Sequence, residues 1–216
     1  MSISAKQVGA LRKKTGAGLM DCKKALAENN GDMEKAIEYL QKKSLAAVGK
    51  RADKVAAEGI IDSYIHSGRI GVLLEVNCET DFVARGDHFK EMARNISMHV
   101  AAMNPSYLDP SEIPADESAK QREIYKAQLL EEGKPEHILD RILVGKMNKW
   151  HSEICLLQQA YVKEDKKTVE EYVTEVASVI KEKISVRRFV RFELGAGIEK
   201  KVDDFAAEVA AAAAGN

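Results

Sequence analysis

Apolar residues recur at steps of three and four over the first fifty positions, which is the spacing of an amphipathic helix. We predict three short helices here. Ser4 can cap the first, which residues 15–18 end with two glycines; the second covers about residues 19–28, and Asp32 can cap the third. The apolar positions predicted on their faces are Val8, Leu11, Leu19, Cys22, Leu26, Met33, Ala36, Ile37 and Leu40.

The pattern changes to a period of two in the next segment, as in strands. Residues 59–66 and 70–78 are predicted strands, and the short connection at 67–69 implies an antiparallel hairpin. A further strand is predicted near the other end of the chain, with one face formed by Val186, Arg188, Val190, Phe192 and Leu194. Since two strands alone are not independently stable, we expect the late strand to pair with the early hairpin in one sheet.

Helical patterns fill the space between these strands. Asp87 can cap a long helix whose apolar face is Phe89, Met92, Ile96, Val100 and Met103. A charged helical hairpin follows at about 117–151, and Thr168 with Glu171 has the spacing of a capping box for another helix. The predicted class is therefore α+β with a protruding helical hairpin. The predicted divisions are a three-helix domain at 1–48, a linker at 49–58, a core domain at 59–200, and a C-terminal helix and tail at 201–216.

Composition and charge exclude several classes of protein. The 33 Lys and Arg residues are balanced by 34 Asp and Glu, so the net charge of −1 argues against a general nucleic-acid binder. No apolar run approaches the roughly 20 residues that span a bilayer, and the first residues lack the apolar stretch of a signal peptide. The three cysteines have no paired spacing, which fits a reducing cytoplasm. We expect a cytoplasmic protein that binds neither nucleic acid nor membrane.

The sequence contains no convincing catalytic, cofactor or metal site. Cys78 and His88 could be a nucleophile and its base, but Cys78 ends a buried strand pattern, where a small thiol is usually inert. The histidines lack metal-ligand spacing. Gly16 and Gly18 resemble a phosphate-binding loop, yet no strand precedes them and no Lys-Ser or Lys-Thr follows. We therefore predict no catalytic residue, no cofactor and no metal.

The most informative segment is EVNCETDFVAR at residues 75–85, where a predicted strand ends. Thr80 and Asp81 are helix-capping residue types and could simply begin a short turn. Phe82 then occupies a loop-like position. A phenylalanine is more often part of a core than of a binding site, but an exposed aromatic at a rigid strand end is a good anchor for a protein interface.

This segment resembles the signature of the elongation factor Ts family, the exchange factors for elongation factor Tu. Two further segments carry the same resemblance: LRKKTGAGLMDCKKAL at 11–26 and FELGAGIEK at 192–200. The resemblance covers essentially the whole chain. It implies an N-terminal domain similar to a ubiquitin-associated (UBA) domain, followed by an antiparallel-sheet core. One core module of the longer members is missing here, which implies a homodimer like those of other short members.

The resemblance also implies roles for individual residues. The turn of Thr80, Asp81, Phe82 and Val83 would enter elongation factor Tu near its Mg²⁺ site and release GDP, without any catalysed chemical reaction. In the N-terminal domain, Arg12, Leu19 and Met20 match positions of a second contact. His66, at the first hairpin turn, matches a further contact.

Two other hypotheses remain open from the residues. The first is a UBA-like adaptor that binds proteins or peptides through the first fifty residues and has no exchange activity. It leaves the Thr80–Val83 turn without a purpose. The second is a cysteine-dependent enzyme, which would require a reactive thiolate at Cys78.

Overall fold

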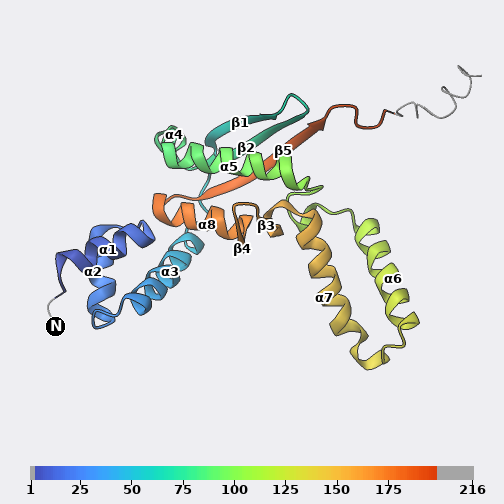
Figure 1. The fold of residues 1–216 in the computed structure, drawn as a ribbon, viewed down its shortest axis with the longest axis horizontal. Coiled ribbons are helices and arrows are strands. Elements are labelled where there is room, and N and C mark those ends of the chain that lie inside the picture. Colours follow the sequence, from blue (N-terminus) through green and yellow to red (C-terminus); the bar gives the residue numbers. More distant parts are fainter. Residues whose placement is uncertain (1–2, 199–216) are drawn as a thin grey trace, which may run out of the picture.

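A computed structural model describes residues 3–198 and has an α+β fold (Figure 1). A three-stranded antiparallel sheet has the order β1-β2-β5, and a separate two-stranded ribbon pairs β3 with β4. The strands are β1 (Glu58–His66), β2 (Ile70–Cys78), β3 (Ala160–Tyr161), β4 (Glu164–Thr168) and β5 (Ile184–Glu193). The α-helices are α1 (Ala5–Thr15), α2 (Leu19–Glu28), α3 (Met33–Gly49), α4 (Asp81–Ala84), α5 (Asp87–Met103), α6 (Ala115–Glu131), α7 (Glu136–Ile154) and α8 (Val169–Ile180). Two short 3₁₀ turns are η1 (Pro110–Glu112) and η2 (Leu156–Gln158).

The three N-terminal helices begin and end where the sequence predicts. Ser4 and Gln7 form a capping box at α1, which ends at Gly16 in the left-handed conformation. Asp32 accepts hydrogen bonds from the first amides of α3. Their buried core consists of Val8, Leu11, Cys22, Ala25, Leu26, Ala36 and Leu40.

The prediction that Leu19 lies on the apolar face of α2 is wrong. Its side chain is 53% exposed. Leu19 is the first residue of α2, and helical side chains lean toward the N-terminus, where no earlier turn of this helix exists to pack against. Ala25 takes a core position instead.

Helix α5 covers one face of the sheet. Val72, Leu74 and Val76 of β2 point toward it and are buried in one cluster with the helix residues Phe89, Met92, Ile96 and Val100. The predicted cap Asp87 is the first helical residue, and Gly86 occupies the cap position without a side-chain bond. The helical spacing predicts Met103 on the buried face, but its side chain is 45% exposed at the last turn of the helix.

The late strand pairs with the early hairpin as predicted, but Val186 does not share a face with Arg188, Val190 and Phe192. The register shifts within the β2–β5 pair, so that Val76 lies opposite Val186 while Glu75 lies opposite Arg188. The extra residue, Arg187, inverts the alternation of side chains along β5. Val186 is therefore buried on the α5 side, whereas Val190 and the other predicted residues beyond the bulge are exposed.

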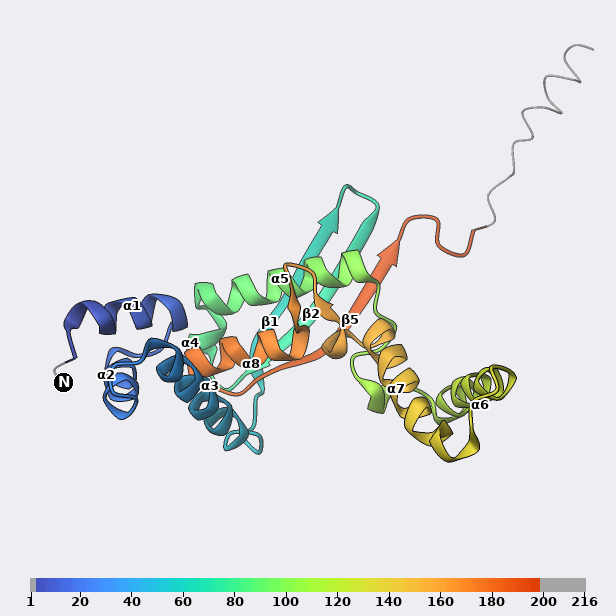
Figure 2. The same cartoon turned by 60° about the horizontal axis from the view of Figure 1, so that its bottom comes forward.

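The helical hairpin of α6 and α7 projects away from the sheet (Figures 1 and 2). Leu129, Leu139 and Leu143 form a small core between its helices. The sequence pattern does not predict the β3–β4 ribbon, because its strands are short and β4 is charged along most of its length. The helix predicted after residue 201 lies outside the described residues. Within 3–198, none of the helices combines the length and apolar character needed to cross a membrane.

The N-terminal helices rest on the core domain through α3 and α8. Asp21 of α2 links the two parts, since it accepts hydrogen bonds from Lys43 at 3.0 Å and from Lys181 at 3.3 Å. The hydrogen bond from the Lys43 ammonium group contributes most, and together with that from Lys181 it holds the pKa of the Asp21 carboxyl below its ordinary value. This bridge connects α2 to the residue that follows α8.

Gly59 permits the close approach of β1 to β2. Its φ is +148°, and a Cβ atom there would lie 2.1 Å from the carbonyl oxygen of Val76. We predict that Gly59→Ala lowers the free energy of unfolding by about 3 kcal/mol, because strain and overlap add. Urea denaturation measures this change in the free energy of unfolding. Gly145→Ala in α7, where a Cβ meets open space, is the control and should be neutral or slightly stabilising. An unchanged urea midpoint for Gly59→Ala would contradict the prediction.

Candidate protein interface

A rigid turn presents Phe82 to solvent where β2 ends. Thr80 caps the single-turn helix α4, and its hydroxyl oxygen accepts a hydrogen bond from the Val83 amide at 3.4 Å. Asp81 pairs with Arg85 one turn later at 2.9 Å. The Phe82 side chain is 82% exposed. The sequence-based prediction of a protruding ring is therefore confirmed in position, although the local structure is a helical turn and not a loop.

The opposite side of this turn is packed onto the core. Ala84 is buried, and Val83 is half-buried against the cluster under α5. Val83 therefore anchors the turn, while Phe82 and Asp81 project outward. The four residues predicted as one site thus divide into a presenting pair and a supporting pair.

Cys78 supports the turn from below, and its surroundings disfavour a reactive thiolate. It is fully buried, and its Sγ donates to the carbonyl oxygen of Thr80 at 3.1 Å. Burial raises the pKa of the Cys78 thiol, so the thiolate that a cysteine nucleophile requires is disfavoured. The hypothesis of a cysteine-dependent enzyme loses its support.

A second exposed surface lies on the N-terminal helices. Met20 is 74% exposed, next to the half-exposed Leu19, and Arg12 projects from α1. Both views place α1 and α2 at the same end of the molecule as α4 (Figures 1 and 2). The structure thus brings two sequence-predicted sites, some sixty residues apart in the chain, to one end.

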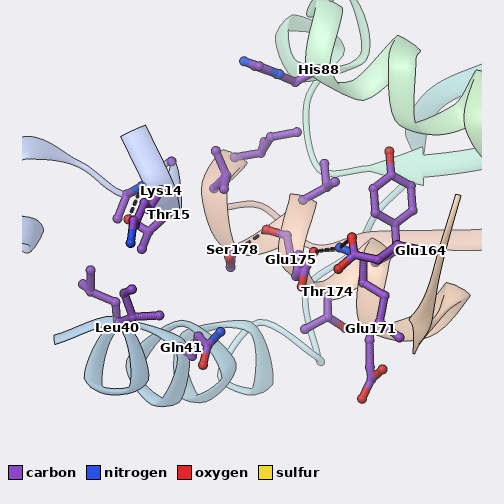
Figure 3. Close-up of a pocket in the computed structure, with 18 of the residues that line it drawn as sticks. Lys14, Thr15, Leu40, Gln41, His88, Glu164, Glu171, Thr174, Glu175 and Ser178 are labelled. Atoms are coloured by element: carbon purple, nitrogen blue, oxygen red, sulfur yellow. Dashed lines mark hydrogen bonds and ion pairs between the residues drawn. The ribbon is translucent and has the colours of Figure 1, made fainter. Parts of the chain in front are cut away.

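An open groove of about 1010 Å³ lies between the N-terminal helices, the start of α5 and α8 (Figure 3). Lys14, His88 and Glu175 are among the residues that line it. Lys167 pairs there with Glu164 at 2.8 Å and with Glu175 at 2.6 Å, so one ammonium group offsets part of the charge of two carboxylates. In residues 3–198 no group of three or more His, Cys, Asp or Glu side chains is arranged to hold a metal ion.

His66 lies at the other end of the sheet from Phe82. It faces Ile70 across the hairpin, whereas Cys78 lies at the far end of the same strand. Eight residues of extended strand separate the two ends by about 27 Å. The Tyr64 hydroxyl and the His66 Nδ1 are 3.0 Å apart, so the exposed imidazole is held in place. His66 could therefore contact only a distant part of any partner that covers Phe82.

Comparison with known proteins identifies the family. A sequence profile described as elongation factor TS matches residues 10–196. Proteins named elongation factor Ts from Geobacter sulfurreducens and Desulforamulus reducens are 57% and 54% identical, over 99% and 97% of both chains. The protein of that name from Myxococcus xanthus is 54% identical over 96% of both chains. The chain therefore belongs to the elongation factor Ts family and has its role in translation elongation.

Proposed function

We propose that the chain is a cytoplasmic guanine-nucleotide exchange factor for elongation factor Tu. It binds the GDP-bound partner, disturbs the Mg²⁺ and phosphate site through the Thr80–Val83 turn, and releases GDP so that GTP can bind. The observation that carries this proposal is the exposure of Phe82 on a capped helical turn, within the segment that resembles the family signature. The chain holds no nucleotide in this mechanism and catalyses no chemical reaction.

Exchange requires that the factor bind the nucleotide-free partner more tightly than the GDP-bound partner. Coupling is reciprocal, so the factor weakens GDP binding by the same ratio by which GDP weakens binding of the factor. Moving the partner from 1:99 to 99:1 takes about 5.5 kcal/mol of differential binding. Burying one phenylalanine side chain supplies about 1.5–3 kcal/mol. The required difference in binding free energy therefore needs more than one contact between the factor and its partner.

The second contact is the N-terminal surface of Arg12, Leu19 and Met20, and His66 is a further contact. Met20 and Leu19 together expose apolar side chains that a partner helix can cover. Helices α1, α2 and α4, which carry these residues and Phe82, lie at one end of the molecule, so a single partner bound at that end can contact both surfaces (Figure 2).

Phenylalanine suits the role of a wedge. Its ring is large and has only two side-chain torsions, so little entropy is lost when a partner orders it. Insertion of the ring displaces packed elements beside the Mg²⁺ site. The partner binds GDP through backbone amides and Mg²⁺ around the phosphates. A small shift of these groups weakens the binding of GDP.

We predict that Phe82→Ala slows factor-stimulated GDP release about thirtyfold, which corresponds to a loss of about 2 kcal/mol. Stopped-flow measurement with fluorescent GDP on elongation factor Tu gives this rate. The melting temperature should stay close to wild type, because the ring is exposed. Met103→Ala, at the far end of α5, is the matched control and should stimulate GDP release from elongation factor Tu at the wild-type rate.

Two results would count against the proposal. A wild-type rate of GDP release with Phe82→Ala would show that the Phe82 ring does not act as a wedge. If the wild-type chain bound elongation factor Tu without accelerating GDP release, the adaptor hypothesis would be favoured instead.

We also propose that the chain forms a homodimer through the sheet face opposite α5. Five large apolar side chains on this face are 49–69% exposed: Ile61, Ile65, Leu73, Val190 and Phe192. The register places Leu73 directly opposite Val190, and Ile61 and Ile65 lie two residues on either side of Ser63, which faces Leu73 on β1, so all three strands contribute apolar residues to this face. Apolar side chains that gather on one exposed sheet face are typical of a protein interface. A second copy is its natural occupant, because two such faces can pack as a sandwich with the same residues on both sides.

We predict that Phe192→Asp converts the dimer to a monomer, because the interface would bury an unpaired charge. Size-exclusion chromatography with light scattering should show twice the chain mass for wild type and the single chain mass for the variant. Leu130→Asp, at an exposed position on α6, is the control and should leave the dimer intact. A wild-type protein of single chain mass would contradict the prediction.

A further inference from the structure

Glu182 contacts the Phe82 turn from a segment about one hundred residues away in sequence. It lies between α8 and β5. Its Oε2 accepts hydrogen bonds from the amides of Glu79 and Thr80, both at 3.1 Å, and its Oε1 accepts from the Thr80 hydroxyl at 2.7 Å. One carboxylate thus satisfies three donors of the turn.

Glu79 makes the reverse contact. Its Oε1 accepts from the amide of Lys183 at 2.6 Å, and both of its oxygens lie 2.8 Å from Nη1 of Arg51 in the linker. The hydrogen bond from the Lys183 amide contributes most, and together with that from Arg51 it holds the pKa of the Glu79 carboxyl below its ordinary value. We call the four residues Glu79, Thr80, Glu182 and Lys183 the brace.

The brace continues the sheet beyond its last backbone pair. The β2–β5 ladder ends with Cys78 opposite Ile184. Extending that register sets Glu79 opposite Lys183 and Thr80 opposite Glu182. At these positions the two carboxylates accept from the backbone amides, a role that carbonyl oxygens have within a ladder. Charge-assisted bonds of this kind are stronger than neutral ones.

Glu182 also controls the cap of α4. The Thr80 hydroxyl has one proton to donate and lone pairs to accept with. Donation to Glu182 leaves a lone pair for the Val83 amide, which starts the helix that carries Phe82. The carboxylate therefore contacts both the backbone and the cap residue of the turn.

We propose that Glu182 is a positioning residue that holds the Phe82 ring in its binding orientation before the partner arrives. This inference rests on the proposed exchange function. A turn ordered in advance loses less conformational entropy on binding than a mobile one, so a given contact yields more affinity. The Lys183 Nζ also donates to the carbonyl oxygens of Ala52 and Lys54, so the brace ties the linker of the N-terminal domain to the same turn.

The test is a stopped-flow titration of GDP release from elongation factor Tu with Glu182→Ala and Glu182→Gln, each alone and each combined with Phe82→Ala. We expect Glu182→Ala alone to raise the half-saturating concentration about tenfold, which equals about 1.4 kcal/mol. Glu182→Gln keeps one oxygen for the amides and should recover more than half of that loss. In the Phe82→Ala background, the same change should alter release less than twofold, because no ring remains to be positioned.

Glu112→Ala is the matched control, because Glu112 also accepts from a backbone amide, that of Leu108 at 2.8 Å, but in a different loop. It should leave the titration unchanged. Hydrogen exchange supplies a readout independent of the partner: in Glu182→Ala, the amides of Glu79 and Thr80 should lose protection while those of α5 keep it.

Some outcomes would overturn the proposal while leaving the exchange function intact. One is that Glu182→Ala slows release by the same factor whether or not the Phe82 ring is present, which would show that it acts on the fold in general. Unchanged protection at Glu79 and Thr80 would show that the carboxylate does not hold the turn. If Phe82→Ala alone had no effect on release, the proposed function would fail, and amide protection would then decide the role of Glu182.

Discussion

The pairing of β5 with β2 is the interaction on which the rest of the structure depends. These strands are more than one hundred residues apart, and their ladder runs from Ile70 opposite Glu193 to Cys78 opposite Ile184. The pairing completes the sheet on which α5 packs. At one end it also brings Glu182 against the turn that presents Phe82. The same contact thus builds the core and sets the geometry of the candidate interface.

Among the large apolar side chains that the described part of the chain exposes are those of the Phe82 turn, of Leu19 and Met20, and of the sheet face opposite α5. Each is backed by a buried element, so the exposure is not a sign of weak packing. Phe82 is part of a capped turn with Ala84 and Cys78 buried beneath it. Rigid support under an exposed apolar side chain is the arrangement expected of a protein whose function is to bind other proteins.

The sequence was sufficient for features that depend on near neighbours. Ser4, Asp32 and Thr168 cap helices as their spacing predicts. The hairpin and its pairing with the late strand also followed from alternation and from the instability of two strands alone. The exposed face of β5 could not be predicted, because the bulge at Arg187 arises from pairing with β2 and leaves no mark in the alternation itself. Glu182 was missed for a similar reason: an acidic residue before a strand is ordinary until a partner 102 residues away is known.

The most direct test of the central claim is a comparison of two affinities, those of the chain for nucleotide-free and for GDP-bound elongation factor Tu. Isothermal titration calorimetry or surface plasmon resonance measures both. The account predicts much tighter binding to the nucleotide-free partner, and a smaller ratio of the two affinities when the Phe82 ring is removed. Equal affinities for both forms would contradict it, because a protein that binds both states alike cannot drive GDP release.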